Sequence, residues 1–201
     1  MTREAREAYS RRAGEYIEHL GAISTVHPAD LELVTRWARQ VGGPVLDAGC
    51  GPGHWTAHLA EAGVDVRGVD GVSEFVDHAR AAHPGCRFEQ ADLEALPLGD
   101  ASVSGVLAWY SLIHHRPEGI GVPLAEFTRV LRLGGQLLLG FFHGDPVERF
   151  DHAVAPAYRW SIGKLAERVR MAHFEVIETC TRTGPGHRPH GAIVARLSTE
   201  H

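Results

Sequence analysis

The sequence predicts one α/β domain in which helices cover both faces of a mostly parallel sheet. Short apolar runs rich in β-branched residues alternate with amphipathic stretches, which is typical of βαβ units. A glycine-rich segment, AGCGPG at 48–53, directly follows the first apolar run. Acidic residues end the first three runs at Asp47, Asp70 and Asp92. Because the carboxyl ends of parallel strands share one edge of a sheet, we expect these acids at a common ligand site.

The elements of the first two thirds of the chain follow from apolar periodicity and from turn residues. A charged helix is expected over 3–20, where apolar residues share one face. A second helix follows Pro28 and ends at Gly42–Gly43. Further helices are expected from the glycine-rich segment to Gly63, over 73–82 and over 124–131. The expected strands are 44–47, 65–70, 87–92, 102–112 and 136–142.

The last third of the chain is less regular. Residues 143–160, with two prolines and several aromatic residues, predict an irregular insertion. Ser161 is expected to cap a helix that reaches about 172. Strands at 174–182 and 192–197, joined by GPGHRPHG, are expected to pair antiparallel. The sequence therefore predicts a seven-stranded sheet with one antiparallel strand.

Composition limits the class of protein. The 201 residues are 44% hydrophobic and 22% charged, as in ordinary globular domains, so we expect a single domain over 1–201. The net charge of −5 gives no electrostatic reason to expect a nucleic-acid partner. No apolar run approaches the roughly 20 residues of a membrane span, and the start of the chain is charged. We therefore expect a cytoplasmic protein; the composition carries no signal for its oligomeric state.

The spacing of the glycines indicates what the glycine-rich segment binds. Gly49, Gly51 and Gly53 form G-x-G-x-G, whereas the dinucleotide fingerprint is G-x-G-x-x-G. Glycines allow a tight turn and let backbone N–H groups approach a ligand. Asp47 directly before them would repel a pyrophosphate but could bind an ammonium group. The pattern therefore favours a zwitterionic ligand over a diphosphate.

The other two acids suggest a nucleoside. Asp70 follows Asp47 by 23 positions, close to the roughly 20-residue spacing at which an acid binds ribose hydroxyls in this topology. Asp92, with the backbone N–H of Leu93, is placed to contact the amine and a ring nitrogen of an adenine.

Four segments now carry a family resemblance. VLDAGCGPG, GVDGVSEFVDHAR, ADLEALPL and LAEFTRVLRLGGQLLLG resemble, in order and over about residues 9–142, the signature segments of class I S-adenosylmethionine-dependent methyltransferases. They resemble most the small-molecule branch that includes the ubiquinone and menaquinone enzymes. The resemblance implies a Rossmann-like fold, S-adenosylmethionine as cofactor with S-adenosylhomocysteine as product, and a small-molecule acceptor. The predicted cofactor-binding residues, which include the acids and two of the glycines above, are Tyr9, Tyr16, Asp47, Ala48, Gly49, Cys50, Gly51, Asp70, Gly71, Val72, Asp92, Leu93, Trp109 and Tyr110.

Two histidines are candidates for catalysis. His114 and His115 follow the fourth strand, near the expected methyl group, and an imidazole has a pKa suited to proton abstraction at neutral pH. Their alternative role is packing or capping. Methyl transfer needs a base only when the acceptor must lose a proton. His54 and His58 have the i, i+4 spacing of half a metal site, but no third ligand follows, so we expect no metal.

The acceptor pocket is expected between an N-terminal helical lid, 1–30, and the insertion 143–160. If their basic and polar residues converge, the acceptor would be anionic; otherwise they form a solvated surface. These candidates are Arg11, Arg12, His143, Arg149 and Tyr158, together with His19 and Arg159.

Two further functions remain open at this point. One is another reaction on the same fold, such as a dehydrogenase or an aminopropyl transferase, although the glycine spacing disfavours the dehydrogenase. The other is a non-catalytic protein that binds S-adenosylmethionine or S-adenosylhomocysteine. Methylation of nucleic-acid amino groups is disfavoured, because Ala108-Trp109-Tyr110-Ser111 stands where those enzymes carry N-P-P-Y or D-P-P-Y.

Overall fold

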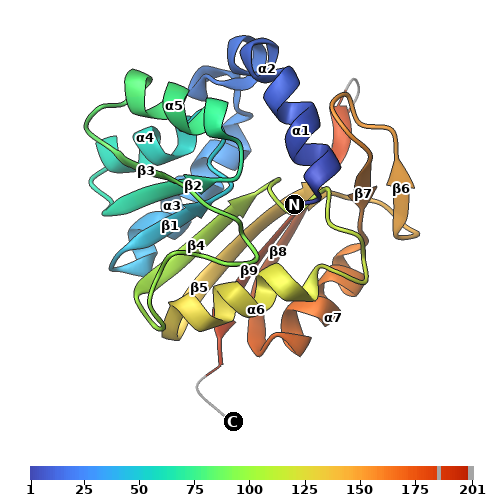
Figure 1. The fold of residues 1–201 in the computed structure, drawn as a ribbon. Coiled ribbons are helices and arrows are strands. Elements are labelled where there is room, and N and C mark those ends of the chain that lie inside the picture. The colour runs from blue at the N-terminus through green and yellow to red at the C-terminus, as the bar shows by residue number, and fades with distance from the viewer. Residues whose placement is uncertain (185–186, 199–201) are drawn as a thin grey trace.

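A computed structural model describes residues 1–184 and 187–198. Its centre is a seven-stranded sheet in the order β3-β2-β1-β4-β5-β9-β8 (Figure 1). β9 runs antiparallel to both of its neighbours, and the other pairs are parallel, as the sequence predicted. The strands are β1 (Val45–Ala48), β2 (Val66–Asp70), β3 (Arg87–Gln90), β4 (Val103–Trp109), β5 (Leu131–Phe142), β8 (Phe174–Gly184) and β9 (His187–Leu197).

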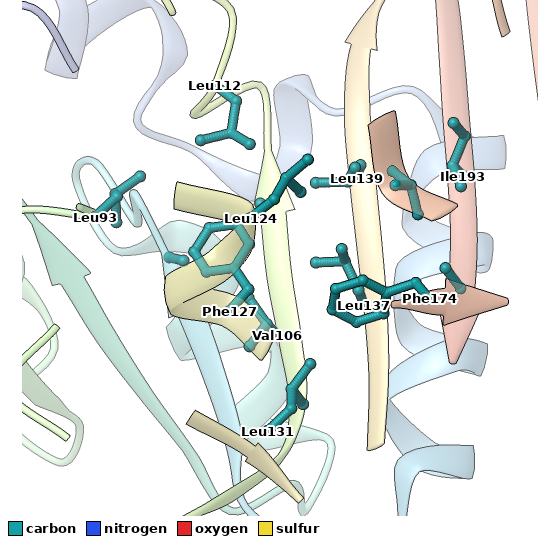
Figure 2. Packing of buried hydrophobic residues seen from close by; sticks show 14 of the residues in the cluster. Leu93, Val106, Leu112, Leu124, Phe127, Leu131, Leu137, Leu139, Phe174 and Ile193 are labelled. Carbon is teal, nitrogen blue, oxygen red and sulfur yellow. The ribbon is translucent and has the colours of Figure 1, made fainter. Parts of the chain in front are cut away.

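Helices cover both faces of the sheet, so that its central strands β1 and β4 are buried on both sides. Successive residues of β1 illustrate this: Val45 packs with α3 and α4, whereas Leu46 packs with α6 and α7. Figure 2 shows the second of these layers, in which Leu124 and Phe127 of α6 face β4, β5 and β9. The helices are α1 (Arg3–Arg11), α2 (Ala13–Leu20), α3 (Pro28–Val41), α4 (His54–Glu61), α5 (Ser73–Ala82), α6 (Gly121–Val130) and α7 (Ile162–Met171), with a 3₁₀ turn at Ile23–Thr25.

Several predicted boundaries were wrong for local reasons. The helix expected over 3–20 is two helices, because the chain leaves helical geometry at Arg12. The strand expected to reach 112 ends at Trp109, since Tyr110 has a φ of 58°. A further boundary was wrong because of pairing with distant chain: the strand expected over 136–142 begins at Leu131, opposite Val103, so that Gly134 and Gly135 lie within β5.

The C-terminal third is more regular than the sequence suggested. The insertion at 143–160 contains a two-stranded hairpin, β6 (Glu148–Phe150) and β7 (Ala157–Arg159). The predicted loop GPGHRPHG is mostly strand, because β8 and β9 continue pairing until Gly184 meets His187. Residues 185–186 of that loop lie outside the described residues.

The N-terminal helices α1 and α2 lie above the carboxyl ends of the parallel strands, where the chain's N-terminus also lies (Figure 1). α1 and α2 both contact α5. Among the described helices, none is long and apolar enough to cross a membrane. The carboxyl edge of the sheet, roofed by α1 and α2, is therefore the place to search for a ligand site.

Candidate functional site

A cavity of about 360 Å³ opens at the carboxyl edge of the sheet, beneath α1 and α2. Segments that follow β1, β2, β3 and β4 form its floor, so strands far apart in sequence contribute to one site. Of the predicted cofactor residues, those that line it are Tyr9, Tyr16, Gly49, Cys50, Gly51, Asp70, Gly71, Val72, Asp92, Leu93, Trp109 and Tyr110. Asp47 and Ala48 lie behind this lining, with 1% and 0% of their surface exposed.

The three glycines after β1 have different structural roles. All three have positive φ angles, between 52° and 89°, which residues other than glycine rarely adopt. A Cβ on Gly49 would lie 2.3 Å from the Cβ of Ser111, and one on Gly53 would lie 2.9 Å from that of Ala79. A Cβ on Gly51 would meet nothing within 4 Å, and this residue lines the cavity. Gly51 therefore leaves the backbone open to a ligand, while Gly49 and Gly53 permit close packing.

Asp70 is fixed at the floor of the cavity by the backbone. Its Oδ2 accepts the N–H of Gly51 at 2.9 Å, and its Oδ1 accepts the N–H of Val72 at 2.8 Å. These bonds join the glycine-rich turn to the turn after β2. Burial raises the pKa of Asp70, and the N–H donors oppose that rise. The remaining lone pairs of this carboxyl group are available to a ligand in the cavity.

Asp47 has a different environment from the one that the sequence suggested. Its side chain is buried beneath the turn, where Oδ2 accepts the hydroxyl of Thr56 at 2.7 Å. Burial raises its pKa to about 7, although the Thr56 hydrogen bond acts in the opposite direction. Its contact with a ligand's ammonium group stays a prediction.

Asp92 also lines the cavity, and it is hydrogen-bonded to α1. Its Oδ2 accepts a hydrogen bond from the guanidinium of Arg6, and its Oδ1 accepts the N–H of Glu94 at 3.1 Å. Burial raises the pKa of Asp92, but these donors outweigh it, so that the pKa lies below its usual range. Arg6 and Leu93 line the same part of the cavity.

The two candidate catalytic histidines are separated by the structure. His114 lines the cavity, whereas His115 points away, with Nε2 2.9 Å from the terminal nitrogen of Met1 and 3.1 Å from Glu94. His114 Nδ1 lies 2.8 Å from the carbonyl oxygen of Pro156, so Nδ1 carries the proton and donates it there. Nε2 is then an acceptor, and it receives the hydroxyl of Tyr9 at 2.9 Å. Burial lowers the pKa of His114, so the ring is neutral at neutral pH.

A second polar cluster reaches the cavity wall from the C-terminal strands. The hydroxyl of Tyr110 is hydrogen-bonded to His190 of β9. His190 Nε2 lies 3.7 Å from Asp30 of α3, and Asp30 accepts two hydrogen bonds from Arg182 of β8. Tyr110 and Asp30 line the cavity. The cluster thus joins α3, β8 and β9 around one wall of the site.

The basic residues proposed to bind an anion do not converge in the cavity. Arg11 is exposed, and Arg12 is engaged by Glu15 and by the carbonyl oxygen of Ala153. Arg149 is exposed on β6, and His143 contacts the carbonyl oxygen of Trp160. These residues, together with Tyr158, His19 and Arg159, lie outside the lining. Arg11 and Arg149 instead belong to a solvated charged surface, which was the alternative to an anion site.

Several lining residues escaped the sequence analysis. Arg6 lies three positions before Tyr9 on the same helix, which is a signal that could have placed it beside the site. Phe75 and Trp55 had been assigned only to helices. His152 lies in the loop between β6 and β7, whose hairpin was not predicted, so no periodic pattern could have placed it. Asp30, Ser111 and Phe142 are further members of this group.

The two histidines with the spacing of half a metal site have different surroundings. His58 Nε2 lies 2.8 Å from the hydroxyl of Thr35, while His54 lines the cavity. Within residues 1–184 and 187–198, no group of three or more histidine, cysteine, aspartate or glutamate side chains is placed to hold a metal ion.

Comparison with known proteins identifies the kind of domain. Residues 45–135 match the model of a methyltransferase domain family. Over 150 residues the chain is 33% identical to malonyl-[acyl-carrier protein] O-methyltransferase from Erwinia billingiae, which covers 75% of this chain. The chain spans 58% of the length of that relative.

Solved structures extend the similarity to nearly the whole chain. The structure of 1,6-didemethyltoxoflavin-N1-methyltransferase from Burkholderia thailandensis, with bound 1,6-didemethyltoxoflavin and S-adenosylhomocysteine, matches with a TM-score of 0.75 and 25% identity. The match covers 98% of this chain and 92% of that one. The [4+2]-cyclase SpnF shares the fold, with a TM-score of 0.72 and 19% identity over 86% of this chain and 81% of its own. The chain therefore has the Rossmann-like class I methyltransferase fold.

Proposed function

We propose that this chain is an S-adenosylmethionine-dependent methyltransferase that acts on a small-molecule acceptor. One observation carries the proposal: a single cavity at the carboxyl edge joins the glycine-rich turn, the fixed carboxyl group of Asp70 and the neutral His114. The matched methyltransferase domain and the S-adenosylhomocysteine in a similar structure support it. The finer assignment to the ubiquinone and menaquinone branch is not retained, because the similar relatives described above are not of that type.

The residues of the cavity fit the cofactor. Gly51 leaves its backbone open to the amino-acid end, and Asp70 has lone pairs left for the ribose hydroxyls. Leu93 and Asp92 would flank the adenine. Three carboxyl groups, those of Asp30, Asp70 and Asp92, line the cavity, which suits a ligand that carries an ammonium and a sulfonium charge.

When bound, S-adenosylmethionine would supply an activated methyl group on a positively charged sulfur, with a neutral thioether as the leaving group. The protein's part is to hold the acceptor against that methyl group in a site from which water is excluded. For an acceptor that must lose a proton, Tyr9 and His114 form the route. The acceptor donates to the oxygen of Tyr9, whose hydroxyl proton passes to His114 Nε2. The Pro156 carbonyl keeps the ring in the required tautomer.

The Asp70→Asn variant tests the cofactor site. The amide cannot accept both backbone N–H groups and the ribose hydroxyls, so we expect the affinity for S-adenosylhomocysteine to fall about 10- to 150-fold. Isothermal titration calorimetry measures this affinity. Asp77→Asn is the matched control, because Asp77 lies on the neighbouring helix α5 with 76% of its side chain exposed. Equal affinity in the two variants would exclude Asp70 from cofactor binding.

The two alternative functions of this fold predict different reaction products. A non-catalytic binding protein would bind the cofactor and methylate no acceptor, whereas another reaction on this fold would consume substrate without forming S-adenosylhomocysteine. Product analysis by mass spectrometry separates the three functions once an acceptor is in hand.

A further inference from the structure

Aromatic rings form an unbroken row along the wall of the cavity. We call this row the aromatic belt; it consists of Phe75, Tyr16, Tyr9, His114, His152 and Phe142, all of which line the cavity. Neighbouring ring centres are 5.1–5.7 Å apart. The rings come from α5, α2, α1, the segment after β4, the segment after β6 and the end of β5. Such a wall presents large flat apolar surfaces, with the hydroxyls of two tyrosines as polar points.

Apart from Tyr9 and Tyr16, which are also predicted cofactor residues, the belt is separate in origin from the cofactor residues. The glycine-rich turn, Asp70 and Asp92 follow β1, β2 and β3, whereas the belt comes mainly from the N-terminal helices and from segments after β4 and β5. The belt therefore remains available to the second substrate. Unlike the cofactor residues, most of it lies in parts of the chain that the methyltransferase domain model does not cover.

The charge of the cavity excludes one class of acceptor from this wall. Two described lining residues carry a cation: the guanidinium of Arg6 is paired with Asp92, and the terminal ammonium of Met1 is paired with Glu94 at 3.3 Å. Burial lowers the pKa of His114, whose Nε2 accepts the hydroxyl of Tyr9, and burial lowers the pKa of His152 to about 4. His27 accepts the N–H of Ala29 at Nδ1. Asp30 also lines the cavity, and its carboxylate is paired with Arg182 of β8.

We propose that the methyl acceptor is an uncharged planar aromatic molecule with a hydroxyl or ring N–H group, which lies against the aromatic belt. This inference rests on the proposed methyltransferase function and names the acceptor class for the same cavity. An aromatic acceptor would make offset or edge-on contacts with the rings of the belt. An anionic acceptor would lose its hydration in a cavity whose described lining residues offer it no unpaired cation.

The test uses one ring in two charge states. Methyl 4-hydroxybenzoate is uncharged at neutral pH, and 4-hydroxybenzoate carries a carboxylate. Each is titrated calorimetrically into the full chain saturated with S-adenosylhomocysteine, and malonyl-pantetheine serves as an anionic non-aromatic probe. We expect the ester to bind at least about tenfold more tightly than either anion. Equal or tighter binding of an anion, or no binding of the ester, would overturn the inference.

A belt variant and a control variant test whether the ester binds at the aromatic belt. Phe142→Leu removes a ring from it, and the ester affinity should fall about fivefold or more. Phe150→Leu is the matched control: Phe150 contacts Phe142 edge-on at 5.2 Å but lies outside the cavity lining, so the affinity should stay within about twofold. Phe75→Leu repeats the test on α5 if the first variant does not fold. Equal ester affinity in the belt and control variants would contradict the assignment.

The outcomes separate the two proposals. If S-adenosylhomocysteine itself does not bind the wild-type chain, the proposed function fails and the inference fails with it. If S-adenosylhomocysteine binds and the ester shows no preference over the anions, only the acceptor class is wrong.

Discussion

The carboxyl group of Asp47 lies beneath the glycine-rich turn, and its ionisation changes the stability of the fold with pH. Burial raises its pKa to about 7, whereas an unfolded chain leaves an aspartate near 3.9. The native state therefore binds a proton between these values that the unfolded state does not. The stability that Asp47 contributes is fully present below the unfolded pKa and is lost as pH rises towards about 7.

The Asp47→Asn variant tests this pH dependence. The difference in unfolding free energy, wild type minus variant, should decrease by on the order of 2 kcal/mol between about pH 5 and pH 8. Urea unfolding at several pH values measures it. Asp65→Asn is the control, since Asp65 is an exposed partner of Arg87. A difference that is constant or increases with pH would contradict the burial argument.

Gly49 and Gly51 share the left-handed backbone but differ in their surroundings. Gly51→Ala should cost about 1–2 kcal/mol of unfolding free energy from backbone strain alone. Gly49→Ala should cost at least about 1 kcal/mol more, because the new Cβ would lie 2.3 Å from that of Ser111. Urea unfolding compares the two variants. Equal losses would mean that Ser111 moves aside freely.

Between elements, the ion pair of Asp30 and Arg182 ties α3 to β8 beside the site. Asp30 has 9% of its side chain exposed, so removing Arg182 leaves a carboxylate largely out of water. Arg182→Met should lower the unfolding free energy by about 2–4 kcal/mol, and adding Asp30→Asn should restore part of it.

The control for this pair joins the same two elements. Arg36 of α3 pairs with Glu178 of β8, but their side chains are 50% and 40% exposed. Arg36→Met should therefore change the unfolding free energy by less than about 1 kcal/mol. Similar losses for Arg36→Met and Arg182→Met would show that burial does not distinguish the two pairs.

Sequence patterns at the element level were most informative where local chemistry sets the boundary. Pro28 and Gly42 delimit α3 as expected, and Ser161 caps α7 by accepting the N–H of Lys164. The patterns failed where pairing with distant chain decides the structure. β5 extends back to Leu131 because Val103 pairs with it, and β8 extends to Gly184 because β9 lies beside it. Neither partner can be recognised from the local sequence.

For the whole molecule, the sheet and its carboxyl-edge site were predictable, because acids and glycines at strand ends carry that information locally. The wall of the cavity was not. His152 enters from a hairpin in the predicted irregular insertion, and Tyr110 meets His190 across 80 positions of sequence. Arg11 and Arg12, chosen for their charge, lie outside the lining because α1 directs Arg6 and Tyr9 towards it instead.

The central claim is that this cavity binds S-adenosylmethionine and its demethylated product. Calorimetric titration of the wild-type chain with S-adenosylmethionine, S-adenosylhomocysteine and a nicotinamide dinucleotide tests it most directly. We expect one site per chain with a dissociation constant in the micromolar range, about −8 kcal/mol, for the first two ligands and no heat from the third. No binding of S-adenosylmethionine or S-adenosylhomocysteine, or comparable binding of the dinucleotide, would contradict the account.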